Sequence, residues 1–141
     1  MEIEEKYAIH PILMMGKIKH YRDETVTINL RGRLGLITVS DTLINSKEPI
    51  HSDMLLEFYF SYIQVTSHPL DYDQLELLNQ EEVFPCLLGG KISHVDDTAV
   101  RVQLDNELGN IYVPRRWIFT SVDLVEGLDV EFYLSKMNVK K

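Results

Sequence analysis

The sequence predicts an all-β protein, built as a tandem duplication of one small β-barrel with a short connecting helix between the copies. The first indication is an internal repeat: residues 11–65 align without a gap with residues 85–139, and 19 of the 55 aligned pairs are identical. The second is that apolar and polar residues alternate along short runs in both copies, which is typical of strands with one buried face. A period of 74 residues that is used only twice favours a duplicated domain over a solenoid.

The repeat divides the chain into a first barrel over residues 1–66, an acidic linker over 67–84 that we expect to be helical, and a second barrel over 85–141. A domain of this size buries only about 60% of its unfolded surface. We therefore expect the two copies to pack on each other and to share apolar residues. The candidates for this contact are Tyr7, Leu70, Leu75 and Leu78.

The first strand of each copy is predicted over residues 12–21 and 86–95, and its interior glycines, Gly16 and Gly90, predict a bulge or a sharp bend. The second strand alternates strictly between apolar and polar residues, so one face is expected to be buried. The side chains expected to point inward are Val26, Ile28, Leu30, Val100, Val102 and Leu104. Those expected to point outward are Thr25, Thr27, Asn29, Ala99, Arg101 and Gln103.

A polar, glycine-containing link of hairpin length leads into a third strand around residues 37–39 and 111–113. Ser40 and Pro114 end that strand and suit the start of a short helical turn, serine as the cap and proline in the first turn. A long last strand is predicted over residues 54–65 and 128–139 because both runs are rich in aromatic and β-branched residues. Six of its side chains should enter the cores: Leu56, Phe58, Phe60, Val130, Phe132 and Leu134. In the linker, a helix capped by Asp71 or Asp73 would turn Leu75, Leu77 and Leu78 toward a barrel.

The net charge of −8 argues against a nucleic-acid-binding protein, because no overall field would attract a polyanion. Five of the acidic residues lie in the linker, which has no lysine or arginine, so the two repeats themselves are nearly neutral. Cys86 is the only cysteine, lies in an apolar run and is expected to be a core residue in a reducing compartment. The acidic N-terminus does not fit a signal peptide, and no apolar run approaches about 18 residues, so we expect a cytoplasmic protein.

Each repeat resembles the OB-fold RNA-binding modules of the cold-shock and ribosomal-protein kind. The resemblance depends on "GKI" at Gly16 and Gly90, on "GLITVS" and "GNIYVP" in the third strand, and on "EGLDVEFYLS" in the last. It implies a small barrel whose second and third strands carry exposed aromatic residues that stack on bases. In this chain only Tyr112 meets that requirement, so the resemblance supports the fold more than the activity. An SH3-like barrel would explain the same strand pattern.

Six polar positions are identical in the two copies: Lys17/Lys91, His20/His94, Asp23/Asp97, Glu57/Glu131, Tyr59/Tyr133 and Ser61/Ser135. They would fit either a proton-transfer or anion site, or structural contacts that both copies need. We favour the structural interpretation, in which each lysine pairs with the glutamate across the strands, the tyrosines pack between the copies, and the aspartates lie in the first hairpin turn.

The segment "PRRWIF" is the one run that is both basic and aromatic, and its counterpart in the first copy is "SDTLIN". Arg115, Arg116 and Trp117 would suit an interface hot spot or a base-stacking surface. In the other interpretation, which we favour, Trp117 takes the core position of Leu43, and the arginines are solvated or pair with the acidic linker. The remaining candidate binding residues are Arg101 and Tyr112 on the barrel face and Arg31 and Arg33 in the "RGRLG" loop.

Two functions remain open. We favour a non-enzymatic interaction module whose partner is another protein, because the charge and the scarcity of exposed aromatic residues both disfavour the alternative. That alternative is weak binding of RNA or single-stranded DNA through the barrel face. No catalytic residue, cofactor or metal site is predicted, since the histidines lack ligand spacing and no phosphate-binding or nucleophile motif is present. The oligomeric state is left open.

Overall fold

The computed structural model describes residues 9–70, 72, 74–79, 82–105 and 108–140. It is an all-β protein, as predicted, in which twelve strands of the described chain join one hydrogen-bonded sheet. The first half contains β1 (Ile12–Arg22), β2 (Thr25–Leu30), β3 (Leu36–Ser40), the 3-10 turn η1 (Asp41–Leu43), β4 (Ile44–Asn45), β5 (Leu55–Phe60) and β6 (Ile63–Val65). The second half contains β7 (Cys86–Val95), β8 (Ala99–Leu104), β9 (Gly109–Pro114), η3 (Arg115–Trp117), β10 (Ile118–Phe119), β11 (Asp129–Leu134) and β12 (Met137–Lys140).

Every element of the second half begins within one residue of the position 74 beyond its counterpart, and the strand registers repeat as well. Gly16 lies opposite Leu30, and Gly90 lies opposite Leu104. Both helical turns begin where they were predicted. Ser40 caps η1 by accepting a hydrogen bond from the Thr42 amide, but Pro114 occupies the cap position of η3 rather than its first turn.

The predicted inward faces form the core. All six side chains predicted to point inward from β2 and β8, and all six from β5 and β11, are at most 6% exposed. Thr27 departs from the predicted alternation, because it is only 8% exposed although it faces outward. Its hydroxyl shares a 3.3 Å hydrogen bond with that of Thr38 on the adjacent strand. Cys86 lies in the core, as expected.

The bulge predicted at Gly16 and Gly90 lies elsewhere. The register of β1 shifts between Ile18 and His20, and that of β7 between Ile92 and His94. The glycines serve a different purpose, since a Cβ atom at Gly90 would lie 2.6 Å from the carbonyl oxygen of Gln103. They allow neighbouring strands to approach closely where the sheet curves, which the sequence pattern alone does not distinguish from a bulge.

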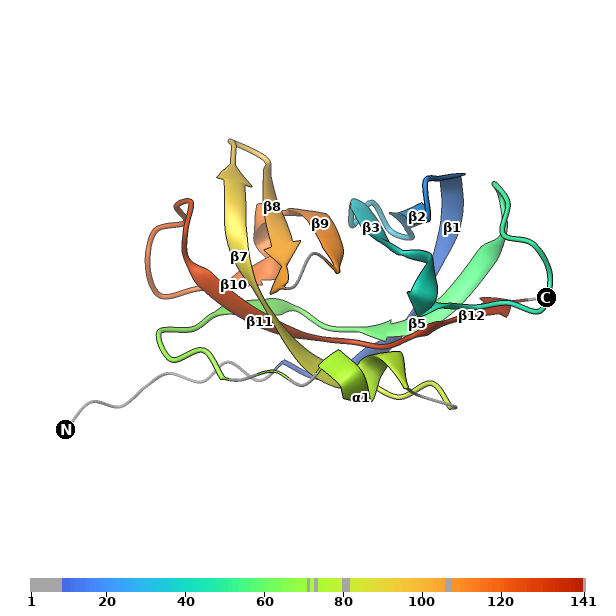
Figure 1. Ribbon diagram of the computed structural model, residues 1–141. Coiled ribbons are helices and arrows are strands. Elements are labelled where there is room, and N and C mark those ends of the chain that lie inside the picture. The colour runs from blue at the N-terminus through green and yellow to red at the C-terminus, as the bar shows by residue number, and fades with distance from the viewer. Residues whose placement is uncertain (1–8, 71, 73, 80–81, 106–107, 141) are drawn as a thin grey trace.

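The long last strand predicted in each copy is broken in two, and its second part pairs with the other half of the molecule. β6 joins β11 antiparallel and β10 in parallel, while β12 joins β5 antiparallel and β4 in parallel. Figure 1 shows the run from β5 to β6 and the run from β11 to β12 passing side by side beneath both lobes of the molecule. The pairing of β5 with β11 also closes eight of the strands into a ring.

The crossing point has local twofold symmetry. Phe60 pairs with Leu134, its own counterpart at an offset of 74 residues. Next to this pair, Ser61 and Ser135 are fully buried, and each hydroxyl oxygen accepts a 2.8 Å hydrogen bond from a backbone amide of the other half. The donors are the amides of Tyr133 and Tyr59 respectively. The repeated serines are therefore structural residues that satisfy backbone groups where the ladder breaks.

The two halves meet again where β3 pairs with β9. Ile37 pairs with Ile111, so the local twofold axis passes through this seam as well. An added Cβ atom at Gly35 would collide with the carbonyl oxygen of Tyr112, and one at Gly109 would collide with that of Thr38. The backbone of Gly35 is left-handed, with φ of +100°. The glycine in each "LG" pair is therefore required at the seam by close backbone approach.

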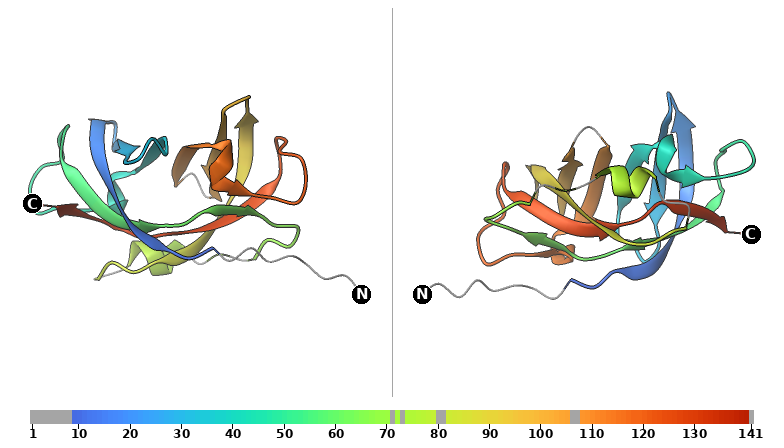
Figure 2. Two further views of the ribbon diagram at one scale, coloured as in Figure 1. Left: turned by 180° about the vertical axis from the view of Figure 1, so that it is seen from behind. Right: turned by 60° about the horizontal axis from the view of Figure 1, so that its bottom comes forward.

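The linker contributes one short helix, α1 (Gln74–Leu78), on the side of the long strands away from the β2–β3 and β8–β9 hairpins (Figures 1 and 2). Leu77 is fully buried, and the Tyr72 hydroxyl donates a 2.8 Å hydrogen bond to Glu131. Leu70 was expected between the copies but is 61% exposed, because the chain there runs over the surface before the helix begins. Tyr7, Asp71, Asp73 and the side chain of Leu75 lie outside the described residues.

The seam glycines can be tested against another glycine of the same link. Gly32 is also left-handed, with φ of +74°, but open space surrounds its Cβ position. Gly32→Ala should cost about 1–2 kcal/mol from backbone strain alone. Gly35→Ala should cost a further 1–3 kcal/mol or so, because β3 and β9 must move apart. Urea unfolding of both variants measures the difference, and equal losses would contradict close packing at the seam.

The exchange of β6 and β12 predicts that neither half folds by itself. Residues 1–66 and 84–141, expressed separately, should each lack cooperative unfolding, because each half would leave its closing strands without partners. Mixing the two fragments should restore the circular dichroism spectrum of the whole chain. Cooperative unfolding of either fragment with the stability of the parent would show that the halves are independent.

Candidate functional site

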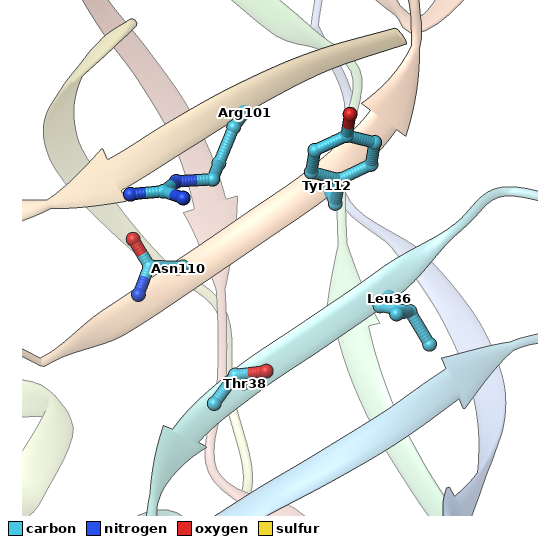
Figure 3. Close-up of a pocket in the computed structure, with 5 residues that line it drawn as sticks. All are labelled: Leu36, Thr38, Arg101, Asn110 and Tyr112. Atoms are coloured by element: carbon cyan, nitrogen blue, oxygen red, sulfur yellow. The ribbon is translucent and has the colours of Figure 1, made fainter. Parts of the chain in front are cut away.

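A hollow of about 270 Å³ lies on the outer face of the sheet where the two halves join. We call it the seam hollow. It is lined by Leu36 and Thr38 of β3, Arg101 of β8, and Asn110 and Tyr112 of β9 (Figure 3). These side chains face outward because their neighbours along the strands point into the core. Both halves of the molecule therefore contribute to one site.

The order of side chains across the hollow follows from the strand register. Leu36 pairs with Tyr112, and Tyr112 pairs with Arg101 on its other side. Directly opposed residues on adjacent antiparallel strands point to the same face. An apolar side chain, an aromatic ring and a guanidinium group therefore form one row across three strands.

The hollow is chemically asymmetric although the backbone around it has local twofold symmetry. Tyr112 is the counterpart of Thr38, and Arg101 is the counterpart of Thr27. In the first half the two threonine hydroxyls bond to each other, 3.3 Å apart, and Thr27 is buried. In the second half the same positions carry an exposed guanidinium group and a partly exposed ring. Only the second half therefore presents charge and aromatic surface at this seam.

Asp96, in the turn between β7 and β8, fixes the position of Tyr112. The tyrosine hydroxyl donates a 2.9 Å hydrogen bond to Oδ2 of Asp96. Oδ1 of the same carboxylate accepts from the amides of Thr98 and Ala99, at 2.9 and 2.8 Å. These backbone donors and the tyrosine hydroxyl lower the pKa of Asp96 to about 2. The hydrogen bond to Asp96 raises the pKa of Tyr112, so its hydroxyl stays neutral and occupied as a donor.

Two arginines extend this network. The Nε atom of Arg101 donates a 3.1 Å hydrogen bond to the hydroxyl of Ser93, which holds the guanidinium group across the strands. Within the described part of the chain, Arg101 forms no ion pair. Arg115 donates from Nη1 to the backbone carbonyl oxygen of Asp96 at 2.8 Å, and so joins η3 to the same turn.

Asn110 lines the hollow from β9, the middle of its three strands, and its side chain has an acceptor without a hydrogen bond. Its Oδ1 atom is buried and has no hydrogen-bond partner among the described residues. A buried acceptor in this state costs about 1–3 kcal/mol. Such atoms in native proteins usually meet an ordered water or a ligand.

The structure brings together two of the predicted binding residues, Arg101 and Tyr112, and places Arg115 beside them. Arg116 is exposed on η3, as expected, but does not line the hollow. Arg31 and Arg33 are exposed in the turn between β2 and β3 and do not line it either. Three lining residues were not predicted as site residues: Leu36, Thr38 and Asn110. The alternation of the third strand in each copy predicts that these side chains point outward. Only the pairing of β3 with β9 brings them together in one site.

Of the two interpretations of Trp117, the structure confirms the core position and contradicts the prediction of a binding residue on the surface. The indole is 6% exposed, and its Nε1 atom donates a buried 2.9 Å hydrogen bond to the carbonyl oxygen of Ser61. Tyr62 stacks on it with ring centroids 3.9 Å apart, and Phe119 stacks on the far side of Tyr62 at 4.5 Å. Trp117 thus takes the core position of Leu43, and the aromatic stack secures β6 against β10.

The predicted cross-strand ion pairs are also wrong. Lys17 lies 3.8 Å from Asp53, and Lys91 lies 2.9 Å from Asp129, so both lysines pair with residues just before or at the start of the facing strand. The exchanged strands supply the partners of the two glutamates. Glu57 pairs with Lys140 of β12, and Glu131 accepts hydrogen bonds from Tyr72 and from Gln64 of β6. Sequence alone does not show this exchange. Asp23 and Asp97 lie in the first hairpin turns, as predicted.

Other chemistry has little support in the described residues. They contain no group of three or more histidine, cysteine, aspartate or glutamate side chains placed to hold a metal ion. Their helices are too short and too polar to cross a membrane. No protein-family model matches the chain, and no curated protein is significantly similar to it. The function must therefore be inferred from the geometry of the seam hollow.

The anchoring of Tyr112 predicts a defined pH dependence. Because the pKa of Asp96 is lowered to about 2, from an ordinary value near 3.9, its contribution to stability is complete above about pH 4 and is lost as the pH falls toward 2. Asp96→Asn should therefore be less stable than the native chain at pH 7, by a margin that shrinks between pH 4 and 2. Urea unfolding across this range measures the margin. Asp97→Asn, at the neighbouring exposed position, is the control, and a margin for Asp96→Asn that persists at pH 2 would contradict the assignment.

Proposed function

We propose that this protein is a non-enzymatic binding module and that it binds another protein at the seam hollow. The observation that carries the proposal is the chemical asymmetry of the hollow on a symmetric backbone. Stability explains the residues that the two halves share, such as the seam glycines. It does not explain an exposed Arg101 and a fixed Tyr112 where the other half has two threonines bonded to each other. Exposed arginine and tyrosine side chains are enriched at protein interfaces.

The composition of the hollow supports binding rather than catalysis. Its lining residues include no pairing of a nucleophile with a general base. The Tyr112 hydroxyl is already engaged as a donor to a carboxylate, and Arg101 is a permanent cation. These groups recognise a ligand, and they hold no proton that could be transferred near neutral pH.

A second candidate function is weak binding of RNA or single-stranded DNA at the same face. The observation that favours it is the direct pairing of Arg101 with Tyr112, which places a guanidinium group beside an aromatic ring. The net charge of −8 opposes it, as does the presence of a single aromatic side chain among the lining residues. Affinity for nucleic acid depends on several phosphate contacts made by basic side chains.

We further infer that each half is a small OB-like or SH3-like barrel completed by the closing strand of the other half. The matched order of strands and 3-10 turns in the two halves supports this, as does the matched register shift in β1 and β7. The pairing of β6 with β11 of the second half, and of β12 with β5 of the first half, supports an exchange of closing strands between the halves. In this arrangement the seam hollow lies between two barrel faces.

Affinity capture with the whole chain tests the proposed function. Arg101→Ala/Tyr112→Ala should lose one or more host proteins that the native chain retains, while Arg22→Ala, at an exposed arginine that does not line the hollow, should keep them. Arg22 and Arg101 are both exposed, so Arg22→Ala and Arg101→Ala alone should each change the free energy of unfolding by no more than about 0.5 kcal/mol. Quantitative mass spectrometry of the captured proteins, with and without nuclease, gives the result. Capture that nuclease abolishes would favour the nucleic-acid alternative, and capture that the double variant does not change would exclude the hollow.

A further inference from the structure

We propose that the seam hollow recognises one acidic side chain, with an apolar side chain two residues away, on an extended segment of the partner protein. This inference rests on the proposed function and names the chemistry of the partner. It depends on the row formed by Leu36, Tyr112 and Arg101 across β3, β9 and β8.

Arg101 supplies the charged end of the row. Its Nε atom is engaged by Ser93, so the two Nη groups remain for a ligand. Figure 3 shows the guanidinium group extending along the hollow on the side of Asn110. No carboxylate of the described chain pairs with it, and the oxygens of the nearby, ionised Asp96 already accept hydrogen bonds from the amides of Thr98 and Ala99 and from the Tyr112 hydroxyl. A guanidinium group with two free nitrogens binds a carboxylate in a bidentate geometry.

Leu36 and the ring of Tyr112 supply the apolar end. The hydroxyl of Thr38, the other β3 residue in the hollow, is engaged with Thr27, so the first half contributes little further polarity. Adjacent strands lie about 4.8 Å apart, so the backbones at Leu36 and Arg101, two strands apart, are separated by roughly 10 Å across the sheet. Side chains two residues apart on an extended segment are separated by about 7 Å at the backbone, and the lengths of the segment's own acidic and apolar side chains make up the remainder.

The size of the hollow favours the side chains of a docked segment over a free small molecule. At about 270 Å³ it is smaller than pockets that enclose drug-sized ligands, which begin at roughly 300 Å³. The side chain of Asn110 also lines the hollow, on the side toward which the Arg101 guanidinium extends (Figure 3), and adds a polar group at the charged end.

The overall charge restricts the partner further. A chain of net charge −8 repels a strongly acidic protein or a polyanion at long range. The seam hollow nevertheless presents Arg101, a cation that forms no ion pair within the described residues. The two conditions are met together by a segment that carries a single aspartate or glutamate among neutral or basic residues.

A random dodecapeptide library displayed on phage, selected on the immobilised whole chain and counter-selected on Arg101→Ala/Tyr112→Ala, tests the proposal. The retained peptides should share an aspartate or glutamate two residues from an apolar residue. In titrations of a synthetic representative, replacing the acid by its amide should weaken binding roughly tenfold or more, as loss of a charge-assisted bidentate contact predicts. Arg101→Glu should reverse the preference toward a peptide with lysine at that position, and Arg22→Ala should bind as the native chain does.

The outcomes separate this inference from the proposed function. Peptides that depend on the hollow but bind equally well with the acid or its amide would overturn the acidic recognition and leave the protein-binding function in place. Failure to obtain any hollow-dependent peptide would overturn both. Salt-sensitive binding of a fluorescent dodecauridylate, lost in Arg101→Ala, would overturn both in favour of nucleic acid.

Discussion

The close approach of β3 and β9 is the constraint on which the rest of the molecule depends. Two backbones can meet at Gly35 and Gly109 only because neither residue carries a Cβ atom. This contact continues the sheet from one half to the other, and the β5–β11 crossing then closes it into a ring. The core, the exchange of closing strands and the outer hollow all follow from that closed path, since each requires both halves to be held at a fixed register.

The positions at which the two halves of the symmetric frame differ are not alike in kind. Trp117 occupies the core position that Leu43 has in the first half, and its ring stacks on Tyr62. This change therefore adds an aromatic contact inside the molecule. Arg101 and Tyr112 replace two threonines on the outside. They gain no core contact, and their hydrogen bonds to Ser93 and Asp96 serve to hold them in place. A change that fixes polar groups at the surface fits recognition better than it fits stability.

Rigidity is the property that the seam hollow offers a partner. Its lining residues come from three paired strands rather than from loops, and a turn aspartate with an ionised carboxylate fixes its aromatic ring. A preorganised site loses less conformational entropy when it binds, so a small contact area can still be selective. The asymmetry of its two walls adds direction, because a ligand with a charged and an apolar end fits in one orientation.

Composition and periodicity in the sequence were enough to determine the all-β class, the inward faces of β2, β5, β8 and β11, and the outward positions of Arg101 and Tyr112. Those properties are local, because a period of two and a matched offset are visible in the chain itself. Only the tertiary structure decided which strands pair across the halves. That choice removed Trp117 from the surface, gave Glu57 and Glu131 partners on exchanged strands, and brought Leu36 and Asn110 beside Tyr112. The physical reason is that pairing between distant strands is set by backbone hydrogen bonding and shape complementarity over the whole closed sheet, and no short segment contains that information.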